Sequence, residues 1–166
     1  MTYPQTLEWL YAQLPMFQRT GPVRYRLDLS KTLGLCNALG HPEKGLQVIH
    51  IAGTNGKGSV SHAVAAALQA RGLKVGLSTS PHLEDPRERI RVNGTCISES
   101  DFVAFVADNM KVWRTWEPSF FEVMFTMGLD AFRKAEVDVA VLETGMGGRL
   151  DSVSYTHLRA HETQPY

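Results

Sequence analysis

Short β-branched runs and longer amphipathic segments follow one another along the chain. The runs at 48–52, 73–77 and 137–142 are short and apolar, which predicts buried strands. Between the first two runs, apolar residues recur at the spacing of one helical face: Val60, Ala63, Val64, Ala67 and Leu68. This alternation of strand and helix predicts an α/β fold with a parallel sheet that is covered by helices on both faces.

Two further helices are predicted to begin at a capping box, in which a hydroxyl and a residue three positions later satisfy the first free N–H groups. Thr2 and Gln5 predict a helix that continues to about Gln13. Ser119 and Glu122 predict a second helix, which is apolar nearly all round and is therefore expected to be buried.

Capping and turn residues also place the remaining elements. Ser30 precedes one predicted helix, and a serine at position 98 or 100 precedes another. The pair Asn93-Gly94 lies between two short stretches with strand character. It predicts a hairpin with a type I′ turn.

Composition narrows the possible partners. Seventeen Lys and Arg residues balance seventeen Asp and Glu residues, which argues against a nucleic-acid or anionic-membrane partner. Cys36 and Cys96 have no Cys or His at metal-ligand spacing, so we expect two buried thiols and no zinc site or disulfide framework. The chain has the length of one domain, and it shows no signal peptide and no membrane-spanning run. We therefore expect a cytoplasmic protein.

Residues 53–59, Gly-Thr-Asn-Gly-Lys-Gly-Ser, lie between the first strand and its helix, where a phosphate-binding loop must lie to function. Glycines let successive N–H groups point inward, the helix adds the positive end of its dipole, and Lys57 adds a mobile cation that is also the expected catalytic residue. The expected nucleotide-binding residues are Thr54, Asn55, Gly56, Lys57, Gly58 and Ser59.

The strict P-loop pattern is not met. Ile51 stands in place of its first glycine, and Gly58 stands where Ser or Thr should follow the lysine. The alternative to phosphate binding is an ordinary glycine-rich turn between a strand and a helix.

This variant loop resembles that of the Mur ligase superfamily, and its Gly58-Ser59 ending resembles the folylpolyglutamate synthase/dihydrofolate synthase branch. Three further stretches resemble the same family: Ser80-Pro-His-Leu83 with residues 88–94, Ser119-Phe-Phe-Glu122, and residues 143–151. The resemblance covers about residues 1–151. It implies the N-terminal part of an ATP-binding, Mur ligase-like central domain with a P-loop NTPase-like fold, truncated before its end.

The resemblance also implies the chemistry. It indicates an ATP-dependent ligase of folate biosynthesis and one-carbon metabolism, which joins L-glutamate to a folate or dihydropteroate carboxylate through an acyl phosphate. Magnesium is expected with ATP, because Mg²⁺ favours oxygen ligands and binds nucleotide phosphates. Glu143 follows a buried strand at the ligand-binding edge of the sheet and is an expected ligand. The resemblance adds Ser80 as a second ligand.

The resemblance further implies substrate contacts at His82, Phe121 and Asp151. Each expected site residue has a plainer alternative. Phe121 could be core, His82 an exposed loop residue, and Asp151 and Glu143 solvated carboxylates. For Ser80 the alternative is a turn residue before proline.

Residues 152–166 have no apolar period and depart from the family's continuation after Asp151. We expect a non-native or disordered tail there, and no metal site at His157 and His161. The parent ligase is expected to be monomeric, and this chain alone to have little ligase activity.

Other function classes are a Mur-type peptidoglycan precursor ligase, a non-catalytic nucleotide-binding module and a small-molecule kinase. The short stretch before Gly53 argues against the first, because those enzymes resemble one another in carrying a separate domain ahead of the loop.

Overall fold

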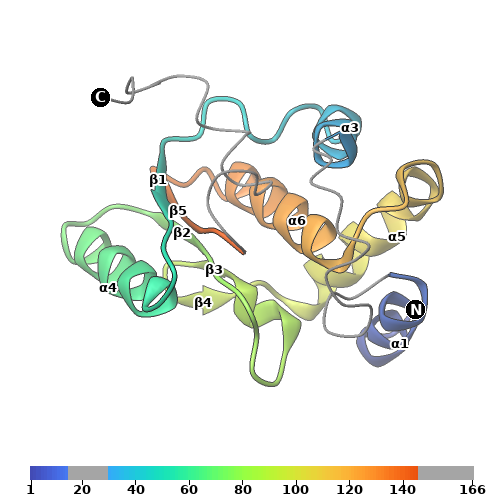
Figure 1. The fold of residues 1–166 in the computed structure, drawn as a ribbon, viewed down its shortest axis with the longest axis horizontal. Coiled ribbons are helices and arrows are strands. Elements are labelled where there is room, and N and C mark those ends of the chain that lie inside the picture. Colours follow the sequence, from blue (N-terminus) through green and yellow to red (C-terminus); the bar gives the residue numbers. More distant parts are fainter. Residues whose placement is uncertain (15–29, 146–166) are drawn as a thin grey trace.

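The computed structural model describes residues 1–14 and 30–145. Its strands are β1 (Val48–Ile51), β2 (Val75–Ser78), β3 (Ile90–Val92), β4 (Thr95–Cys96) and β5 (Val139–Glu143). They form one sheet in the order β1-β5-β2-β3-β4 (Figure 1). β5 is parallel to both of its neighbours, whereas the β2–β3 and β3–β4 pairs are antiparallel. The α/β fold is confirmed, but the sheet is mixed because the predicted hairpin extends it.

Helices cover both faces of this sheet in unequal layers. They are α1 (Tyr3–Gln13), α3 (Ser30–Ala38), α4 (Lys57–Ala70), α5 (Glu99–Trp116) and α6 (Phe120–Lys134), with a 3₁₀ helix η2 (Pro86–Arg89) after β2. α4 packs on β1, β5 and β2, and α6 packs on β2 and β3. Figure 1 shows α4 on one side of the sheet and α6 on the other, with α3, α5 and α1 on the α6 side. The expected covering of both faces is confirmed.

Local sequence sets the ends of several elements. The capping boxes predicted at the starts of α1 and α6 are both formed. Ser98 caps α5, because its Oγ accepts a hydrogen bond from the Asp101 N–H (3.0 Å). In the hairpin, Asn93 and Gly94 both have positive φ, 46° and 79°, as a type I′ turn requires.

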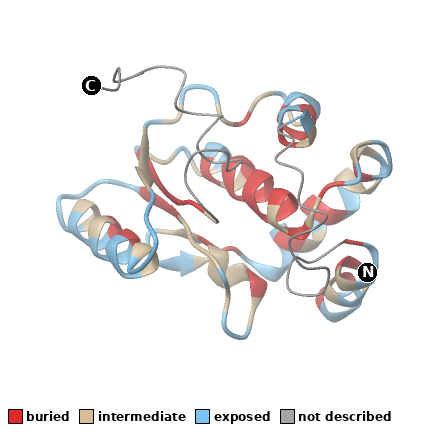
Figure 2. Ribbon diagram, viewed as in Figure 1, coloured by how far each residue is buried: buried red, intermediate tan, exposed pale blue. Residues whose placement is uncertain are grey.

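Two hydrophobic clusters lie on the two faces of the sheet. The larger one joins the sheet to α6, α5, α3 and α1, and Phe102, Leu129 and Phe132 are fully buried in it. The smaller one lies under α4 and includes Ala65 and Val141. Figure 2 shows α6 as the most continuously buried helix, as its apolar sequence predicts.

The two cysteines differ in burial. Cys36 is buried and Cys96 is half-buried, and both are free, so the prediction of two buried thiols is right for Cys36 only. Burial and the nearby Glu43 carboxylate raise the pKa of Cys36 to about 12. Within the described ranges, no helix is both long enough and apolar enough to cross a membrane.

Gly76 in β2 lies against the aromatic ring of Phe132 in α6. A Cβ added at Gly76 would lie 2.6 Å from Phe132 Cδ1, so Gly76→Ala must push the strand and the helix apart. We expect this variant to lower the free energy of unfolding by about 1–3 kcal/mol, measured as a lower urea midpoint.

Gly128→Ala provides the control. An added Cβ there would meet Ile90 Cγ1 at 3.6 Å, an ordinary contact, and alanine favours the helix. We expect no loss of stability from this variant, so equal destabilisation by both substitutions would contradict the packing described.

Candidate functional site

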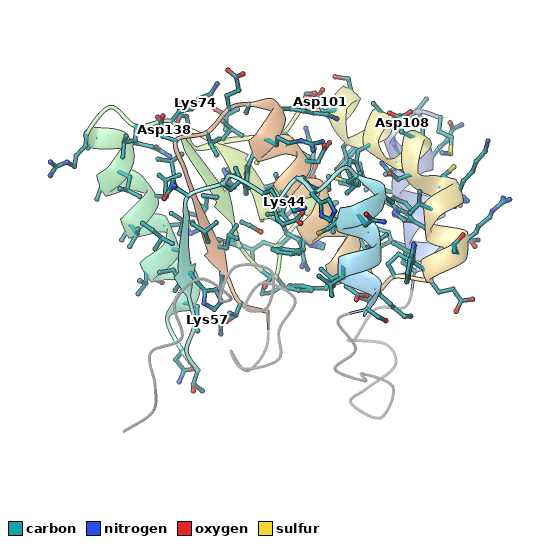
Figure 3. The ribbon with its side chains drawn as sticks, turned by 90° about the horizontal axis from the view of Figure 1, so that it is seen from above. Lys44, Lys57, Lys74, Asp101, Asp108 and Asp138 are labelled. Carbon is teal, nitrogen blue, oxygen red and sulfur yellow. The ribbon has the colours of Figure 1, made fainter. Side chains whose placement is uncertain are left out.

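Three parallel strands end together at one edge of the sheet. Ile51 pairs with Glu143 at the ends of β1 and β5, and β2 ends at Ser78 on the other side of β5. In open α/β sheets, ligands bind at the carboxyl ends of the parallel strands. Figure 3 shows Lys57 at this edge and Lys74 at the opposite one.

The loop after β1 is exposed, and α4 begins directly after it. Gly56 is the N-cap and has φ 76°, in the left-handed region that favours glycine. Lys57 Nζ donates to the Gly53 carbonyl (3.0 Å), so the side chain folds back onto the loop. Helical hydrogen bonding begins with the Val60 N–H, which donates to the Gly56 carbonyl (3.0 Å). The three N–H groups before it, at residues 57–59, are the donors that a helix N-terminus offers to an anion.

The six expected nucleotide-binding residues therefore lie next to one another at the tip of β1. Thr54, Asn55 and Gly56 are exposed in the loop, and Lys57, Gly58 and Ser59 form the first turn of α4. Their contacts with a nucleotide stay a prediction.

Glu143 is buried, with only 6% of its surface exposed, at the end of β5, the middle one of the three parallel strands. The Ser80 N–H donates to its Oε2 (3.0 Å), which brings the two expected metal ligands together. Among residues 1–14 and 30–145, no other group donates a hydrogen bond to this carboxylate. Within these ranges a single neutral donor faces the buried carboxylate, and a buried charge with so few partners there favours a cation beside it. Its burial removes the alternative of a solvated strand-end carboxylate.

The departure at Gly58 from the strict P-loop pattern has a structural counterpart. A Cβ added at Gly58 would lie 3.7 Å from Glu143 Oε2, so a serine there would bring its hydroxyl close to the carboxylate. Two buried hydroxyls, on Ser61 and Thr144, have no hydrogen-bond partner in the described part of the chain. The sequence did not single these out, although Thr144 directly follows Glu143.

His82 lies in the loop after β2 and is oriented by Arg89. Arg89 Nε donates to His82 Nδ1 (2.8 Å), so the proton of the neutral ring lies on Nε2. Burial and the Arg89 cation lower the pKa of His82. The ring lies 6.1 Å from that of Phe120, whereas Phe121 stacks on Phe125 (6.4 Å, 2°). The structure thus places Phe120 beside His82, whereas the ring partner of Phe121 among the described residues is Phe125.

The loop at 79–89 is closed at its base and braced at its tip. The Thr79 N–H donates to the Arg89 carbonyl (3.1 Å). The Glu88 carboxylate accepts from the N–H groups of Asp85, Leu83 and Glu84 (2.8, 3.0 and 2.9 Å). The brace was not predicted, although Asp85 and Glu88 have the spacing of a capping box. Asp151 and the tail at 152–166 lie outside the described residues.

Folylpolyglutamate synthase of Lacticaseibacillus casei is 37% identical over 161 residues, which cover 93% of this chain and 36% of that protein. The crystal structure of folylpolyglutamate synthase from Thermotoga maritima matches with a TM-score of 0.80 and 38% identity, over 91% of this chain and 35% of that one. The chain belongs to the folylpolyglutamate synthase/dihydrofolate synthase family.

Another solved structure is a complex of folylpolyglutamate synthase (FPGS) with AMPPCP and folate. It matches with a TM-score of 0.81 and 34% identity, over 93% of this chain and 38% of that one. No family model matches the chain. The chain spans about a third of the length of the folylpolyglutamate synthases named above.

Glu88→Gln tests the brace at the loop tip. Hydrogen bonds from the N–H groups of Asp85, Leu83 and Glu84 lower the pKa of Glu88 from its ordinary value of 4.5 to about 2. The carboxylate therefore stabilises the fold fully above pH 4.5, and this contribution is lost as the pH falls towards 2. We expect Glu88→Gln to lower the urea midpoint at pH 7 and the difference from the unchanged chain to shrink below pH 4.5.

Glu84→Gln is the matched control, because the exposed Glu84 contributes only its backbone N–H to the brace. An effect of Glu88→Gln that is the same at pH 7 and at low pH would contradict the role given to the ionised carboxylate.

Proposed function

We propose that this chain forms the nucleotide-binding part of an ATP-dependent ligase. The ligase joins L-glutamate to the carboxylate of folate or dihydropteroate. The observation that carries the proposal is the meeting of the Lys57 loop with the buried Glu143 at one edge of the sheet. A solved relative of this fold is described as a complex with folate and AMPPCP, an analogue of ATP.

The loop at 53–59 supplies the cradle for the triphosphate. The N–H groups of residues 57–59 and the α4 dipole attract the anion, and Lys57 adds a full positive charge. The present acceptor of Lys57 Nζ is the neutral Gly53 carbonyl at 3.0 Å. A charged phosphate oxygen is a stronger acceptor, so nucleotide binding should draw Nζ to the phosphates.

In the proposed reaction, the substrate carboxylate attacks the γ-phosphate of ATP, and ADP leaves. The acyl phosphate is then attacked by the amine of glutamate, which forms the amide and releases phosphate. The first step brings together two anions. Lys57 and the loop amides would stabilise the charge that spreads over the transferred phosphoryl group.

A magnesium ion fits beside Glu143. Mg²⁺ usually takes one or two protein oxygens and completes its shell with phosphates and waters. Glu143 offers a buried, weakly compensated carboxylate, and Ser80 is held next to it through its own N–H (3.0 Å). In the part of the chain that is described, no three His, Cys, Asp or Glu side chains group as metal ligands. When bound, the ion would neutralise phosphate charge.

The loop at 79–89 is the proposed substrate side. A neutral His82 with its proton on Nε2 offers a hydrogen-bond donor beside the ring of Phe120, a combination that suits a flat heteroaromatic ring with acceptor atoms. Phe121 and Asp151 stay predicted substrate contacts. That residues 1–151 form the N-terminal part of the ATP-binding domain also stays a prediction, as does the cytoplasmic, monomeric state of the ligase.

Lys57→Ala in the full-length protein tests the proposal. We expect kcat/KM for glutamate-dependent ADP formation with dihydropteroate or folate to fall about 10²- to 10³-fold, because a cation that meets transition-state charge is removed. Lys74→Ala, at the opposite edge of the sheet, is the control and should leave the rate unchanged (Figure 3).

Two results would count against the proposal. Unchanged ligation by Lys57→Ala would show that this loop does not serve catalysis. If the full-length protein turned over a nucleotide-sugar substrate and neither dihydropteroate nor folate, the result would favour the peptidoglycan branch of the superfamily.

A further inference from the structure

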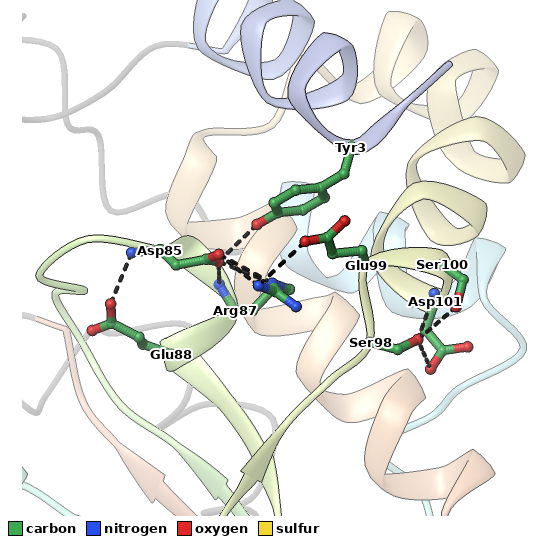
Figure 4. A network of polar contacts seen from close by, with 8 residues as sticks. All are labelled: Tyr3, Asp85, Arg87, Glu88, Ser98, Glu99, Ser100 and Asp101. Atoms are coloured by element: carbon green, nitrogen blue, oxygen red, sulfur yellow. Dashed lines mark hydrogen bonds and ion pairs between the residues drawn. The ribbon is translucent and has the colours of Figure 1, made fainter.

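The loop at 79–89 is attached to the protein on two sides. On the nucleotide side, the Ser80 N–H binds Glu143 Oε2 (3.0 Å). On the far side, Asp85 lies against the first turn of α1 (Figure 4). The two attachments come from opposite ends of the described chain, and η2 itself packs against β3, β4 and α6.

Tyr3 makes the attachment on the far side. Its hydroxyl donates to Asp85 Oδ1 (2.7 Å), across 82 positions of sequence. The Tyr3 ring is buried and lies edge-on to Phe102 of α5, with ring centres 5.3 Å apart. Arg87 binds the same carboxylate (2.8 Å) and lies 4.9 Å from the centre of the Tyr3 ring. Phenol, carboxylate and guanidinium thus contact one another in pairs.

Both partners of the Tyr3–Asp85 bond keep their roles at neutral pH. Burial raises the pKa of Asp85, but hydrogen bonds from Arg87 and Tyr3 outweigh it and lower that pKa to about 2. Burial and the bond to Asp85 raise the pKa of Tyr3. Tyr3 therefore stays a donor and Asp85 an ionised acceptor, and a hydrogen bond to a charged group is among the stronger kinds.

Asp85 connects Tyr3 to the rest of the loop through hydrogen bonds. Its Oδ1 also accepts from the Arg87 N–H (2.8 Å), so the same atom that binds Tyr3 caps η2. The Asp85 N–H in turn binds Glu88, whose carboxylate braces the tip next to His82.

Arg87 cannot replace Tyr3 as the anchor. It belongs to η2 and moves with Asp85, and its own ion pair outside the loop, to Glu99 at 3.7 Å, involves a side chain that is 59% exposed. Exposed pairs of this kind contribute little. Among the described residues, only the Tyr3 hydrogen bond ties the Asp85 side chain to an element outside the loop.

We propose that Tyr3 is a positioning residue for the substrate loop: by holding Asp85 it fixes η2, and through η2 the place of His82. The inference rests on the proposed function, because the substrate that the loop would bind is the one proposed there. The attachment itself is a property of this chain and is testable without any substrate.

Amide hydrogen exchange of the chain measures the attachment. Tyr3→Phe keeps the ring packing on Phe102 and removes only the hydroxyl. We expect the amides of Leu83, Glu84 and Asp85 to exchange about fivefold faster in this variant, because one hydrogen bond to a charged group is lost. In an Asp85→Ala background, Tyr3→Phe should add no further increase.

Thr6→Val is the control on the same helix. It removes the bond from the buried Thr6 Oγ1 to the Thr2 carbonyl (2.9 Å), so it loosens α1 without touching Asp85. Loop exchange should stay unchanged in this variant. Unchanged exchange in Tyr3→Phe, or an equal rise in Thr6→Val, would overturn the attachment whatever the protein catalyses.

Kinetics of the full-length ligase test the positioning. Tyr3→Phe should raise KM for dihydropteroate or folate about fivefold and leave kcat and KM for ATP within about twofold, because only the substrate loop is released. An equal rise in KM for ATP, or a fall in kcat alone, would overturn the inference. If the unchanged ligase uses no pteridine substrate, the proposed function fails, and the exchange measurement still decides the attachment.

Discussion

A carboxylate is buried at the end of β5, the middle one of the three parallel strands, and the neighbouring elements of the site are arranged around it. Glu143 lies between the ends of β1 and β2, within 3.7 Å of a Cβ position at Gly58 and 3.0 Å from the Ser80 nitrogen. Burial of a negative charge is costly unless positive partners approach it. The N-terminus of α4 and the loop around Lys57 supply positive potential at that edge. The site therefore combines a buried anion with donors placed to receive a second anion, which a divalent cation would bridge.

Gly58 shows how one departure from a familiar pattern follows from this arrangement. A hydroxyl at that position would lie next to Glu143 and compete for its lone pairs. With glycine there, no side chain at position 58 approaches the carboxylate. Thr144 follows directly, and its buried hydroxyl has no hydrogen-bond partner among residues 1–14 and 30–145.

The nucleotide side and the substrate side of the site are connected through the loop at 79–89. Glu143 holds the loop at 79–89 at Ser80, and Tyr3 holds it at Asp85, so the core that buries α1 and α6 also sets where His82 lies. Glu88 makes the segment between these points stiff by binding three N–H groups. A change far from the nucleotide loop, in the first turn of α1, is thereby linked to the substrate side.

The sequence by itself determined the local features. Capping boxes at Thr2 and Ser119, the positive φ values at Asn93 and Gly94, and the glycine-rich loop between a strand and a helix all depend on residues close together in the chain. Only the tertiary structure placed β5 between β1 and β2, extended the sheet with an antiparallel hairpin and buried Glu143. It also brought Phe120 to His82 and Tyr3 to Asp85. Such contacts join distant residues, and hydrophobic periodicity records which face of an element is buried but not which partner it meets.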